Sequence, residues 1–261
     1  MEHIERVDLR GQVAVVTGGG RGLGRHLSLE LARAGAAVAI VGRTRATLER
    51  TAAELRGLGA RAELFLADVR DPDAAERVVP ALVARMGEVD VLVNNAGILG
   101  GLGPVATVEP DAFWDAFTVN VRGPFLWSRA VLPSMLGRGR GRIINVSSGS
   151  ARQAVPNGSA YCASKAALSH LTAVLAAELT GSGVTTFAIA PMAATDMLHE
   201  LVVSPRMPAP LRTVFAGIEQ REPEILAASL GLFRTVLSGL LDEHSGAHLD
   251  IRFPLDEQLP V

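Results

Sequence analysis

The chain has 261 residues, of which 48% are hydrophobic and 20% charged, and its formal net charge is -2. This balance excludes a disordered chain and gives no strongly basic surface, so we expect neither nucleic acid nor a membrane as a partner. Because no linker, repeat or low-complexity tract interrupts the sequence, we expect one domain over residues 1–261.

Short apolar runs alternate with longer helical stretches along most of the chain. Near-continuous apolar runs predict buried strands at residues 12–17, 37–41, 62–66, 89–94, 142–147 and 184–189. Helices are predicted between them at residues 23–34, 45–57, 72–85, 111–136 and 159–180, the third with Asp71 as its N-cap and Pro72 in its first turn. This alternation predicts an α/β fold, a doubly wound Rossmann-type parallel sheet of about seven strands with helices on both faces.

The first strand runs into a glycine-rich turn, TGGGRGLG at residues 17–24, which a helix follows. Gly18 allows a sharp turn, Gly22 allows the backbone to approach a pyrophosphate, and Gly24 allows close packing of helix and strand. The helix points its free N–H groups at that pyrophosphate. The pattern predicts a dinucleotide site, and the alternative is a turn that only closes a strand–helix unit. Its predicted cofactor contacts are Gly18, Arg21, Gly22 and Leu23.

Arg43 follows the second predicted strand, at the position where the adenosine ribose is expected. An NAD enzyme usually places an acidic residue here, which would repel a 2′-phosphate. A guanidinium can instead bind that phosphate through two hydrogen bonds, and Arg21 adds a second positive charge nearby. The sequence therefore favours NADP(H) over NAD(H), unless Arg43 is an ordinary surface arginine.

Ser148 follows the fifth predicted strand. Ligands of parallel α/β sheets bind outside the carboxyl ends of the strands, where a hydroxyl can donate to a substrate carbonyl oxygen. We predict this role for Ser148. Ser147 is the rival for it, and Ser148 could instead cap the following turn.

Tyr161 is the only tyrosine of the chain and Lys165 its only lysine. Residues four apart on a helix share a face, so we expect the phenol and the ammonium in one pocket. An ammonium ~4 Å away would favour the phenolate by about 4 kcal/mol, or roughly three pKa units, and bring the phenol near neutral pH. We therefore predict that Tyr161 is the acid/base and that Lys165 lowers its pKa, the alternative being a chance pair on an amphipathic helix.

Residues 192–221 are rich in proline and methionine, and Pro205, Pro208 and Pro210 are expected to prevent a regular helix. A long irregular insertion in a compact domain is usually a lid or a binding loop, so we predict a substrate loop here. Its apolar side chains suit either the lining of a substrate site or the packing of a lid: Met192, Met197, Met207 and Phe215.

These segments closely resemble the short-chain dehydrogenase/reductase family over about residues 8–200, with a weaker similarity to residue 250. The motifs that carry the resemblance are TGGGRGLG at 17–24, Asp68-Val69, NNAG at 94–97, Asn120, Ser148 and YCASK at 161–165. The resemblance implies that Asp68 binds the adenine amino group and that Val69 flanks the ring. It also implies that the turn after the fourth strand shapes the floor of the cofactor site through Asn95, Ala96 and Gly97.

The resemblance further implies the catalytic roles. Ser148 polarises the substrate, Tyr161 transfers the proton, and Lys165 lowers the phenol pKa while it binds the ribose of the cofactor. Asn120 kinks its helix and holds a water molecule that relays protons to Lys165.

The chain departs from the family pattern in two places. The family usually has Pro-Gly after the sixth strand and then a threonine that binds the nicotinamide carboxamide. Here Met192 follows Pro191 and the segment is one residue short, although we still expect Pro191 and Thr195 to contact the cofactor. The family often ends its last strand in Asp-Gly-Gly, where this chain has HLDIR at 248–252. Because that strand commonly helps to form tetramers, we favour a homodimer through the helices at 111–136 and 159–180 and leave a homotetramer open.

Other features bear on the compartment and on metals. Residues 1–6 lack the features of a signal peptide, and no apolar run approaches the ~18 residues that span a bilayer. The single cysteine, Cys162, fits a reducing cytoplasm, and we interpret its side chain as small packing. The six histidines show no metal-ligand spacing, so we predict no metal site.

The leading hypothesis is an NADP(H)-dependent oxidoreductase acting on a small carbonyl or alcohol substrate. Tyr161 would donate the proton and Ser148 would hold the carbonyl oxygen, and the reverse direction would make the protein an alcohol dehydrogenase. The alternative is a non-catalytic dinucleotide-binding or redox-sensing protein, for which the shortened segment after Pro191 is the main argument.

Overall fold

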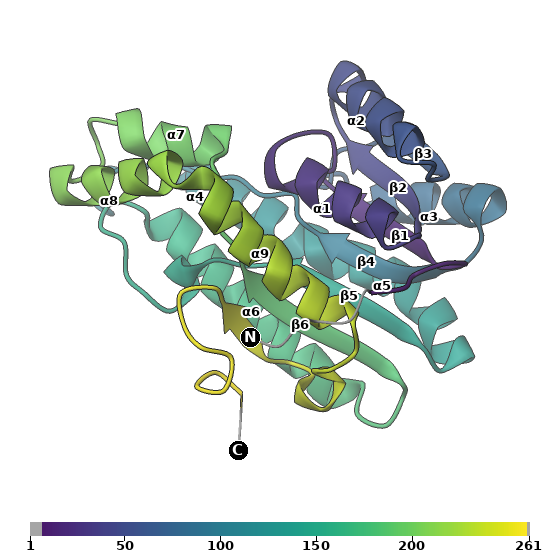
Figure 1. Ribbon diagram of the computed structural model, residues 1–261. Helices are drawn as coiled ribbons and strands as arrows, with labels where there is room; N and C mark the ends of the chain where they lie inside the picture. The colour runs from purple at the N-terminus through teal and green to yellow at the C-terminus, as the bar shows by residue number, and fades with distance from the viewer. Residues whose placement is uncertain (1–6, 260–261) are drawn as a thin grey trace.

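The computed structural model describes residues 7–259, so the expectation about residues 1–6 falls outside it (Figure 1). Its strands form one parallel sheet in the order β3-β2-β1-β4-β5-β6-β7. The doubly wound sheet and the six strand positions predicted from the apolar runs are confirmed. The strands are β1 (Val13–Thr17), β2 (Ala37–Gly42), β3 (Ala62–Leu66), β4 (Val89–Asn94), β5 (Gly141–Val146), β6 (Val184–Ala190) and β7 (His248–Asp250).

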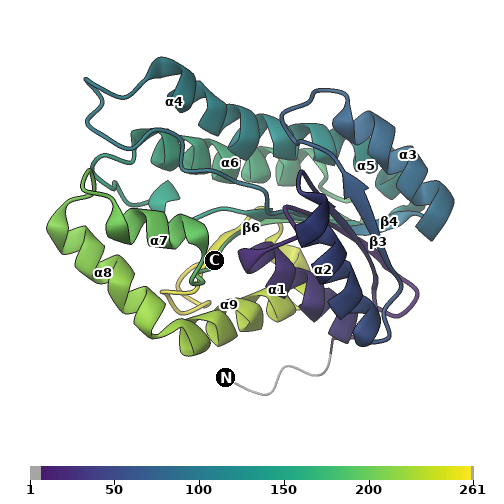
Figure 2. The ribbon, with the colours of Figure 1, turned by 90° about the horizontal axis from the view of Figure 1, so that it is seen from above.

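Helices cover both faces of this sheet (Figure 2). The helices α1, α2 and α9 lie on one side and α3, α5 and α6 on the other, while α7 and α8 project as a pair at one end. Their bounds are α1 (Gly22–Arg33), α2 (Arg45–Gly57), α3 (Ala74–Met86), α4 (Pro110–Phe117), α5 (Gly123–Arg138), α6 (Ser159–Glu178), α7 (Asp196–Val203), α8 (Ala209–Gln220) and α9 (Glu222–Leu237). Within residues 7–259, no helix combines the length and the apolar character that a membrane span requires.

The two covered faces explain why the strands are apolar along their whole length. In β1, Ala14 and Val16 pack into the hydrophobic core on the side of α1 and α9. Val13 and Val15 point the other way, into the second core with residues of α3 and α5. Because successive side chains of a strand alternate between faces, a strand buried on both faces needs apolar residues at every position.

The strand order also fixes where a ligand can bind. The chain first moves from β1 to β2 and β3 and then returns to the other side of β1 to form β4 to β7. Such a reversal leaves a crevice outside the carboxyl ends of the strands. The predicted site residues follow strand ends, so the topology gathers segments that are far apart in the sequence at this edge.

The third predicted helix begins later than expected. It starts at Ala74 with Asp73 in the N-cap position, so the prediction that Asp71 caps this helix and that Pro72 opens it is wrong. Asp71 accepts a hydrogen bond from the Asp73 amide at 3.0 Å and pairs with the Arg77 side chain. Its carboxylate therefore stabilises the turn that precedes the helix.

The prediction of an irregular loop over residues 192–221 is also wrong, because two helices, α7 and α8, occupy most of this segment. Pro205 lies between the helices. Pro208 is the N-cap residue of α8, and Pro210 lies in its first turn. A proline at the start of a helix removes an N–H group that has no partner in the helix, so these prolines are compatible with α8.

Candidate active site

A cavity of about 570 Å³ opens at the carboxyl edge of the sheet. Every predicted catalytic and cofactor residue lines it except Asn120. Its lining comes from the segments that follow β1 to β6 and from α6, α7 and α8. The structure therefore brings the sequence motifs together in one place.

The glycine-rich turn after β1 is tied to the turn after β4. The Asn95 side-chain amide donates to the carbonyl oxygens of Thr17 and Gly18 at 3.0 and 3.3 Å. The Thr17 hydroxyl accepts from the backbone amides of Asn95 and Ala96 at 3.1 and 3.2 Å. A Cβ atom on Gly24 would lie 2.3 Å from the Gly18 carbonyl oxygen, so only glycine allows α1 to approach the turn this closely.

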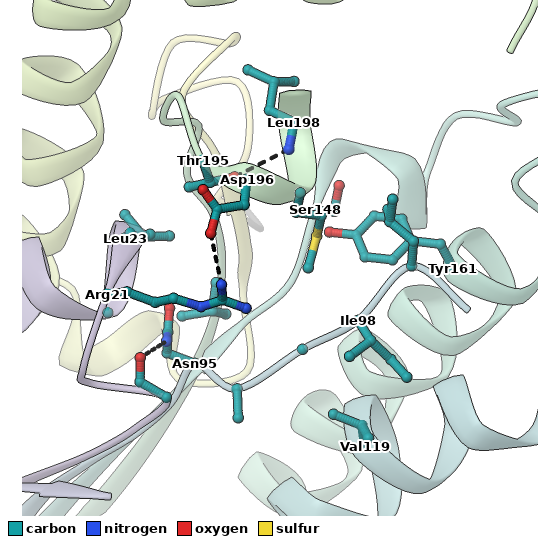
Figure 3. Close-up of a pocket in the computed structure, with 18 of the residues that line it drawn as sticks. Arg21, Leu23, Asn95, Ile98, Val119, Ser148, Tyr161, Thr195, Asp196 and Leu198 are labelled. Carbon is teal, nitrogen blue, oxygen red and sulfur yellow. Dashed lines mark hydrogen bonds and ion pairs between the residues drawn. The ribbon is translucent and has the colours of Figure 1, made fainter. Parts of the chain in front are cut away.

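The residues at the start of α1 fit a pyrophosphate group. In the chain as described, no side chain caps α1, whose first residue, Gly22, lines the cavity. Uncapped N–H groups and the positive end of the helix dipole together favour an anion at this position. The Arg21 guanidinium binds Asp196 of α7 at 2.7 Å, and this ion pair crosses the cavity (Figure 3).

Two arginines surround Asp68 beyond the ends of β2 and β3. Arg70 donates to the Asp68 carboxylate from its backbone and from its side chain, with an ion pair of 2.7 Å. Burial alone would raise the pKa of Asp68, but the hydrogen bonds and charge of Arg70, with the charge of Arg43, hold this pKa below its ordinary value. Arg43 is 58% exposed and makes only a long ion pair with Asp68, at 3.8 Å. The Arg43 guanidinium is therefore well placed to bind a further anion.

Ser148 and Tyr161 direct their hydroxyl groups towards each other across the cavity (Figure 3). Ser148 follows β5 and caps the short helical turn Gly149–Ala151 by accepting from the Ser150 amide at 3.2 Å, while Tyr161 lies in the first turn of α6. The Ser147 hydroxyl is buried and bonded to Ser169 at 2.6 Å and to the Lys165 carbonyl oxygen at 3.3 Å. The geometry thus favours Ser148 over Ser147 as the group that can reach a substrate.

Lys165 is only 3% exposed, and its ammonium donates to the Val146 carbonyl oxygen at 2.7 Å. The same ammonium lies 5.7 Å from the centre of the Tyr161 ring. Burial lowers the pKa of Lys165 to about 8. Burial also raises the pKa of Tyr161, and the hydrogen bond with Ser148 offsets only part of this increase.

The expectation that Lys165 brings the pKa of Tyr161 down towards neutral pH is therefore wrong in this structure. The ammonium is held by the Val146 carbonyl oxygen, and burial of the phenol has the larger effect. Desolvation disfavours the charged form of either group, so it raises the pKa of a phenol and lowers that of an amine. At neutral pH Tyr161 keeps its proton and can donate it.

Asn120 lies behind the cavity, in a π-helical turn, Thr118–Arg122, which separates α4 from α5. This turn agrees with the kink that the family resemblance implies. The Asn120 side chain is buried, accepts from the Ile98 amide, and donates to the Ile98 carbonyl oxygen and the Ser164 hydroxyl, each at 2.9 Å. A Cβ atom on Gly97 would lie 3.2 Å from Asn120 Oδ1 and 3.4 Å from Lys165 Nζ, so both side chains converge on this glycine.

The segment after β6 is held by a residue that the sequence did not single out. Ser229 of α9 is fully buried, and its hydroxyl accepts from the Met192 amide at 2.9 Å and lies 2.6 Å from the Met192 carbonyl oxygen. Thr195 follows in the same segment, lines the cavity and caps α7 by accepting from the Leu198 amide at 3.2 Å. Met192 and Ser229 are 37 residues apart, so no local pattern predicts their contact.

Other lining residues were missed or interpreted differently. Cys162 lines the cavity, whereas we interpreted it from the sequence as small packing. Several apolar residues beside Tyr161 also line the cavity, among them Leu99, Leu102 and Val155. The first two follow the NNAG turn, and that position at the end of β4 is the only signal that could have identified them.

The sequence profile described as short chain dehydrogenase matches residues 12–204. A short chain dehydrogenase from Pseudocercospora fijiensis is 44% identical to this chain over 186 residues, which cover 70% of this chain and 60% of that protein. Two further relatives, from Monascus ruber and Aspergillus terreus, are matched over 63% and 41% of their length. The chain thus spans less than two thirds of these relatives.

Solved structures share the whole fold. NAD+-bound xylitol dehydrogenase superposes with a TM-score of 0.81 at 27% identity, over 93% of this chain and 98% of that chain. A variant of actinorhodin polyketide ketoreductase with NADPH gives a TM-score of 0.82 at 29% identity, over 92% of this chain and 95% of that chain. These two neighbours bind different nicotinamide dinucleotides.

Proposed function

This chain belongs to the short-chain dehydrogenase family, and from that premise we propose that it is an NADP(H)-dependent oxidoreductase that interconverts a ketone and a secondary alcohol. The observation that carries the proposal is the pair of facing hydroxyl groups of Ser148 and Tyr161. They lie in the same cavity as the glycine-rich turn and the buried ammonium of Lys165. One site can therefore hold a dinucleotide and deliver a proton beside it.

The glycine-rich turn and Lys165 would hold the dinucleotide, which in the direction of reduction would supply a hydride for the carbonyl carbon of the substrate. Tyr161, which is protonated at neutral pH because burial raises its pKa, donates its proton to the carbonyl oxygen. Ser148 donates a hydrogen bond to the same oxygen while negative charge develops on it. The carbon gains two electrons with the hydride and the oxygen gains the proton, so the ketone becomes a secondary alcohol and Tyr161 is left as a phenolate.

Lys165 and Asn120 act behind these two groups. The Lys165 ammonium faces the Tyr161 ring and balances the negative charge that proton donation leaves on the phenol. In line with the family resemblance, it also binds the ribose of the cofactor. Asn120 fixes the turn after β4 through Ile98, and the relay of protons through a water molecule at Asn120 is part of the proposal.

The Tyr161→Phe variant tests the reaction because it removes one hydroxyl group and retains the ring. We expect turnover to fall by about 10²–10⁴-fold, as for the loss of a general acid, while NADPH binding, measured by fluorescence titration, is retained.

The serine that follows β5 can be tested in the same assay. Ser148→Ala should also lower kcat strongly, whereas Ser147→Ala should lower kcat less. Wild-type turnover in Tyr161→Phe would refute the mechanism. Tight NADPH binding with no turnover on any ketone or alcohol would favour the non-catalytic alternative.

The preference for NADP(H) rests on Arg43, which directly follows β2 and is exposed. Strand β2 does not end in an acidic residue, which an NAD-specific enzyme usually has at this position. Removal of a charge-assisted bond to a phosphate costs about 1.5–3 kcal/mol, so Arg43→Ala should raise the KM for NADPH by roughly 10–100-fold and leave NADH unaffected. Arg45→Ala is the control, because Arg45 pairs with Glu49 on α2 and does not line the cavity. Equal efficiency of the wild type with both nucleotides would remove the argument.

We also propose that the protein is a cytoplasmic homo-oligomer. Two subunits would contact each other through the face formed by α4, α5 and α6. Large apolar side chains on these helices are exposed, among them Trp114, Phe125 and Val174. Covering these side chains with a second copy of the chain would remove apolar surface from water.

A further inference from the structure

The cavity has two chemically different halves. The half next to the glycine-rich turn carries most of its charged side chains, and these pair with one another. Arg21 binds Asp196 at 2.7 Å, and Arg70 lies 2.7 Å from Asp68 and 3.6 Å from Asp115. This half is suited to the charged and polar groups of a dinucleotide.

The other half is an apolar wall beside Tyr161. We use this name for Leu99, Leu102, Val155, Met197, Met207 and Phe215, all of which line the cavity. They form one hydrophobic cluster, and Tyr161 packs against it. The wall combines the turn after β4, the segment before α6, and the α7–α8 pair. The phenol that donates the proton is thus part of an apolar surface.

No cation among the described lining residues beside this wall is free of a partner. Arg206 is exposed, donates to the Leu102 carbonyl oxygen at 3.1 Å and does not line the cavity. Arg212 does not line it either. Lys165 is buried and donates to the Val146 carbonyl oxygen. Among the described lining residues, a substrate carboxylate on this side would find no uncommitted cation, and an unpaired buried charge is costly.

The polar side chains that line the cavity beside the wall are few and come from two short segments: Ser148 and Ser150, and Tyr161 and Cys162. The hydroxyl groups of Ser148 and Tyr161 face each other, so together they serve a single substrate oxygen. The Cys162 thiol lies 3.9 Å from the Val155 carbonyl oxygen and is only a weak donor. Additional hydroxyl groups of a sugar-like substrate would lose their hydrogen bonds with water against the wall.

Building on the proposed function, we propose that the substrate is an uncharged ketone, or its alcohol, with a hydrocarbon body. Its one oxygen lies between Ser148 and Tyr161, and its apolar body packs against the wall. Sugars and keto acids, which need several polar partners or a free cation, are disfavoured.

Wild-type enzyme should be assayed with straight-chain methyl ketones of increasing length, with NADPH and NADH each supplied in excess. We expect kcat/KM to rise by up to about fourfold for each added methylene until the wall is covered. Two isosteric pairs test polarity directly. 5-Methyl-2-hexanone should exceed 4-oxopentanoate, and 3-pentanone should exceed dihydroxyacetone, each by more than about tenfold, the effect of losing one or more hydrogen bonds in a buried site.

A variant pair on α8 tests whether the wall is responsible. Phe215 lines the cavity, whereas Val214 on the same helix is 58% exposed and does not. Phe215→Ala should lower kcat/KM for the longest ketones by about tenfold or more, with little change for 2-butanone and none in NADPH affinity. Val214→Ala should change none of these values. A general loss of folded protein would instead lower kcat/KM for all ketones by the same factor.

The outcomes separate this inference from the function on which it rests. If 4-oxopentanoate or dihydroxyacetone is the better member of its pair, or if kcat/KM does not depend on chain length, the apolar substrate class is refuted while the oxidoreductase stands. If the enzyme binds NADPH but turns over no carbonyl compound or alcohol with either nucleotide, the proposed function itself fails, and this inference fails with it.

Discussion

At the scale of single residues, burial sets the charge of the two central groups. It raises the pKa of Tyr161 and lowers the pKa of Lys165 to about 8, so each group is pushed towards its neutral form. For the phenol this means a retained proton, which suits a donor in carbonyl reduction. For the ammonium it means a charge that is held in the interior at a cost to stability.

That cost predicts a stabilising substitution. The pKa of Lys165 falls from 10.5 in the unfolded chain to about 8, a difference of about 2.5 units or roughly 3 kcal/mol. The folded state carries this penalty in full below about pH 8, and the penalty disappears as pH rises towards 10.5. Lys165→Met also leaves the Val146 carbonyl oxygen without this donor, which costs about 1–3 kcal/mol, so the net gain in unfolding free energy at neutral pH should be at most roughly 2 kcal/mol.

Urea unfolding of wild type and Lys165→Met at neutral and alkaline pH measures this gain. The difference in unfolding free energy between Lys165→Met and the wild type should shrink as the pH rises from about 8 to 10.5, because only the wild type loses a buried charge in this range. Arg50→Met on the exposed side of α2 is the control and should show no such pH dependence. A variant less stable than wild type at neutral pH would show that the ammonium is a net stabilising group. Activity is expected to be lost in either case.

At the scale of secondary-structure elements, the apolar pattern predicted the sheet because both of its faces are covered. The residues after each strand then had to meet at one edge, which is why Ser148 and the glycine-rich turn could be placed from the sequence. The sequence does not predict the α7–α8 pair, because three prolines in this segment favour an irregular loop. Pro208 and Pro210 lie at the beginning of α8, where proline is tolerated, and the sequence alone does not distinguish the two positions.

Long-range contacts and burial set the limit of what the sequence predicts. The spacing of Tyr161 and Lys165 predicted a shared pocket, and both residues do line one cavity. Whether the pKa of the Tyr161 phenol rises or falls depends on how deeply the pocket buries the phenol and on the bond between Lys165 and the Val146 carbonyl oxygen. The sequence spacing of the two residues predicts neither. The contact between Ser229 and Met192 is equally invisible, because it joins α9 to a segment far away in the chain.

That contact predicts a positioning role for Ser229 in cofactor binding. Ser229→Ala leaves the Met192 amide without its partner, which costs about 1–3 kcal/mol and loosens the segment that contains Pro191 and Thr195. We expect the Kd for NADPH, measured by fluorescence titration, to rise on the order of fivefold or more. Because the effect is on the cofactor segment, the rise in Kd should exceed that of a variant elsewhere on α9 with an equal loss of stability.

Thr235→Val provides the matched comparison. Thr235 lies on the same helix α9 and is buried, and its hydroxyl donates to the Gly231 carbonyl oxygen within that helix. The variant should change stability slightly and leave the Kd for NADPH unaltered. If both variants weaken stability equally and neither changes the Kd, Ser229 has a purely structural role.

At the scale of the whole molecule, the two faces of the sheet differ in what they expose. Figure 2 shows α4, α5 and α6 along one side of the molecule, opposite α1 and α9. On that side Trp114 packs edge-on against Phe113 and at a tilt against Phe117 but remains exposed, and Phe125 and Val174 are exposed as well. Exposed apolar side chains along one side of the molecule suit a two-fold symmetric dimer, in which the same helices of both copies meet.

The dimer predicts a clear response to charge. Phe125, 49% exposed on α5, would lie within the interface, so Phe125→Glu would place two carboxylates, one from each copy, in an apolar contact. Light scattering after size exclusion should then show the mass fall from a multiple of 27.4 kDa to 27.4 kDa. Leu240→Glu, at a residue 66% exposed after α9, should leave the mass unchanged. A monomeric wild type would refute this interface. The same variant should also affect catalysis. Tyr161 lies in the first turn of α6, and contacts with the partner's helices would hold α6 in place. We therefore expect the monomeric variant to have a lower kcat than the wild type and an unchanged Kd for NADPH.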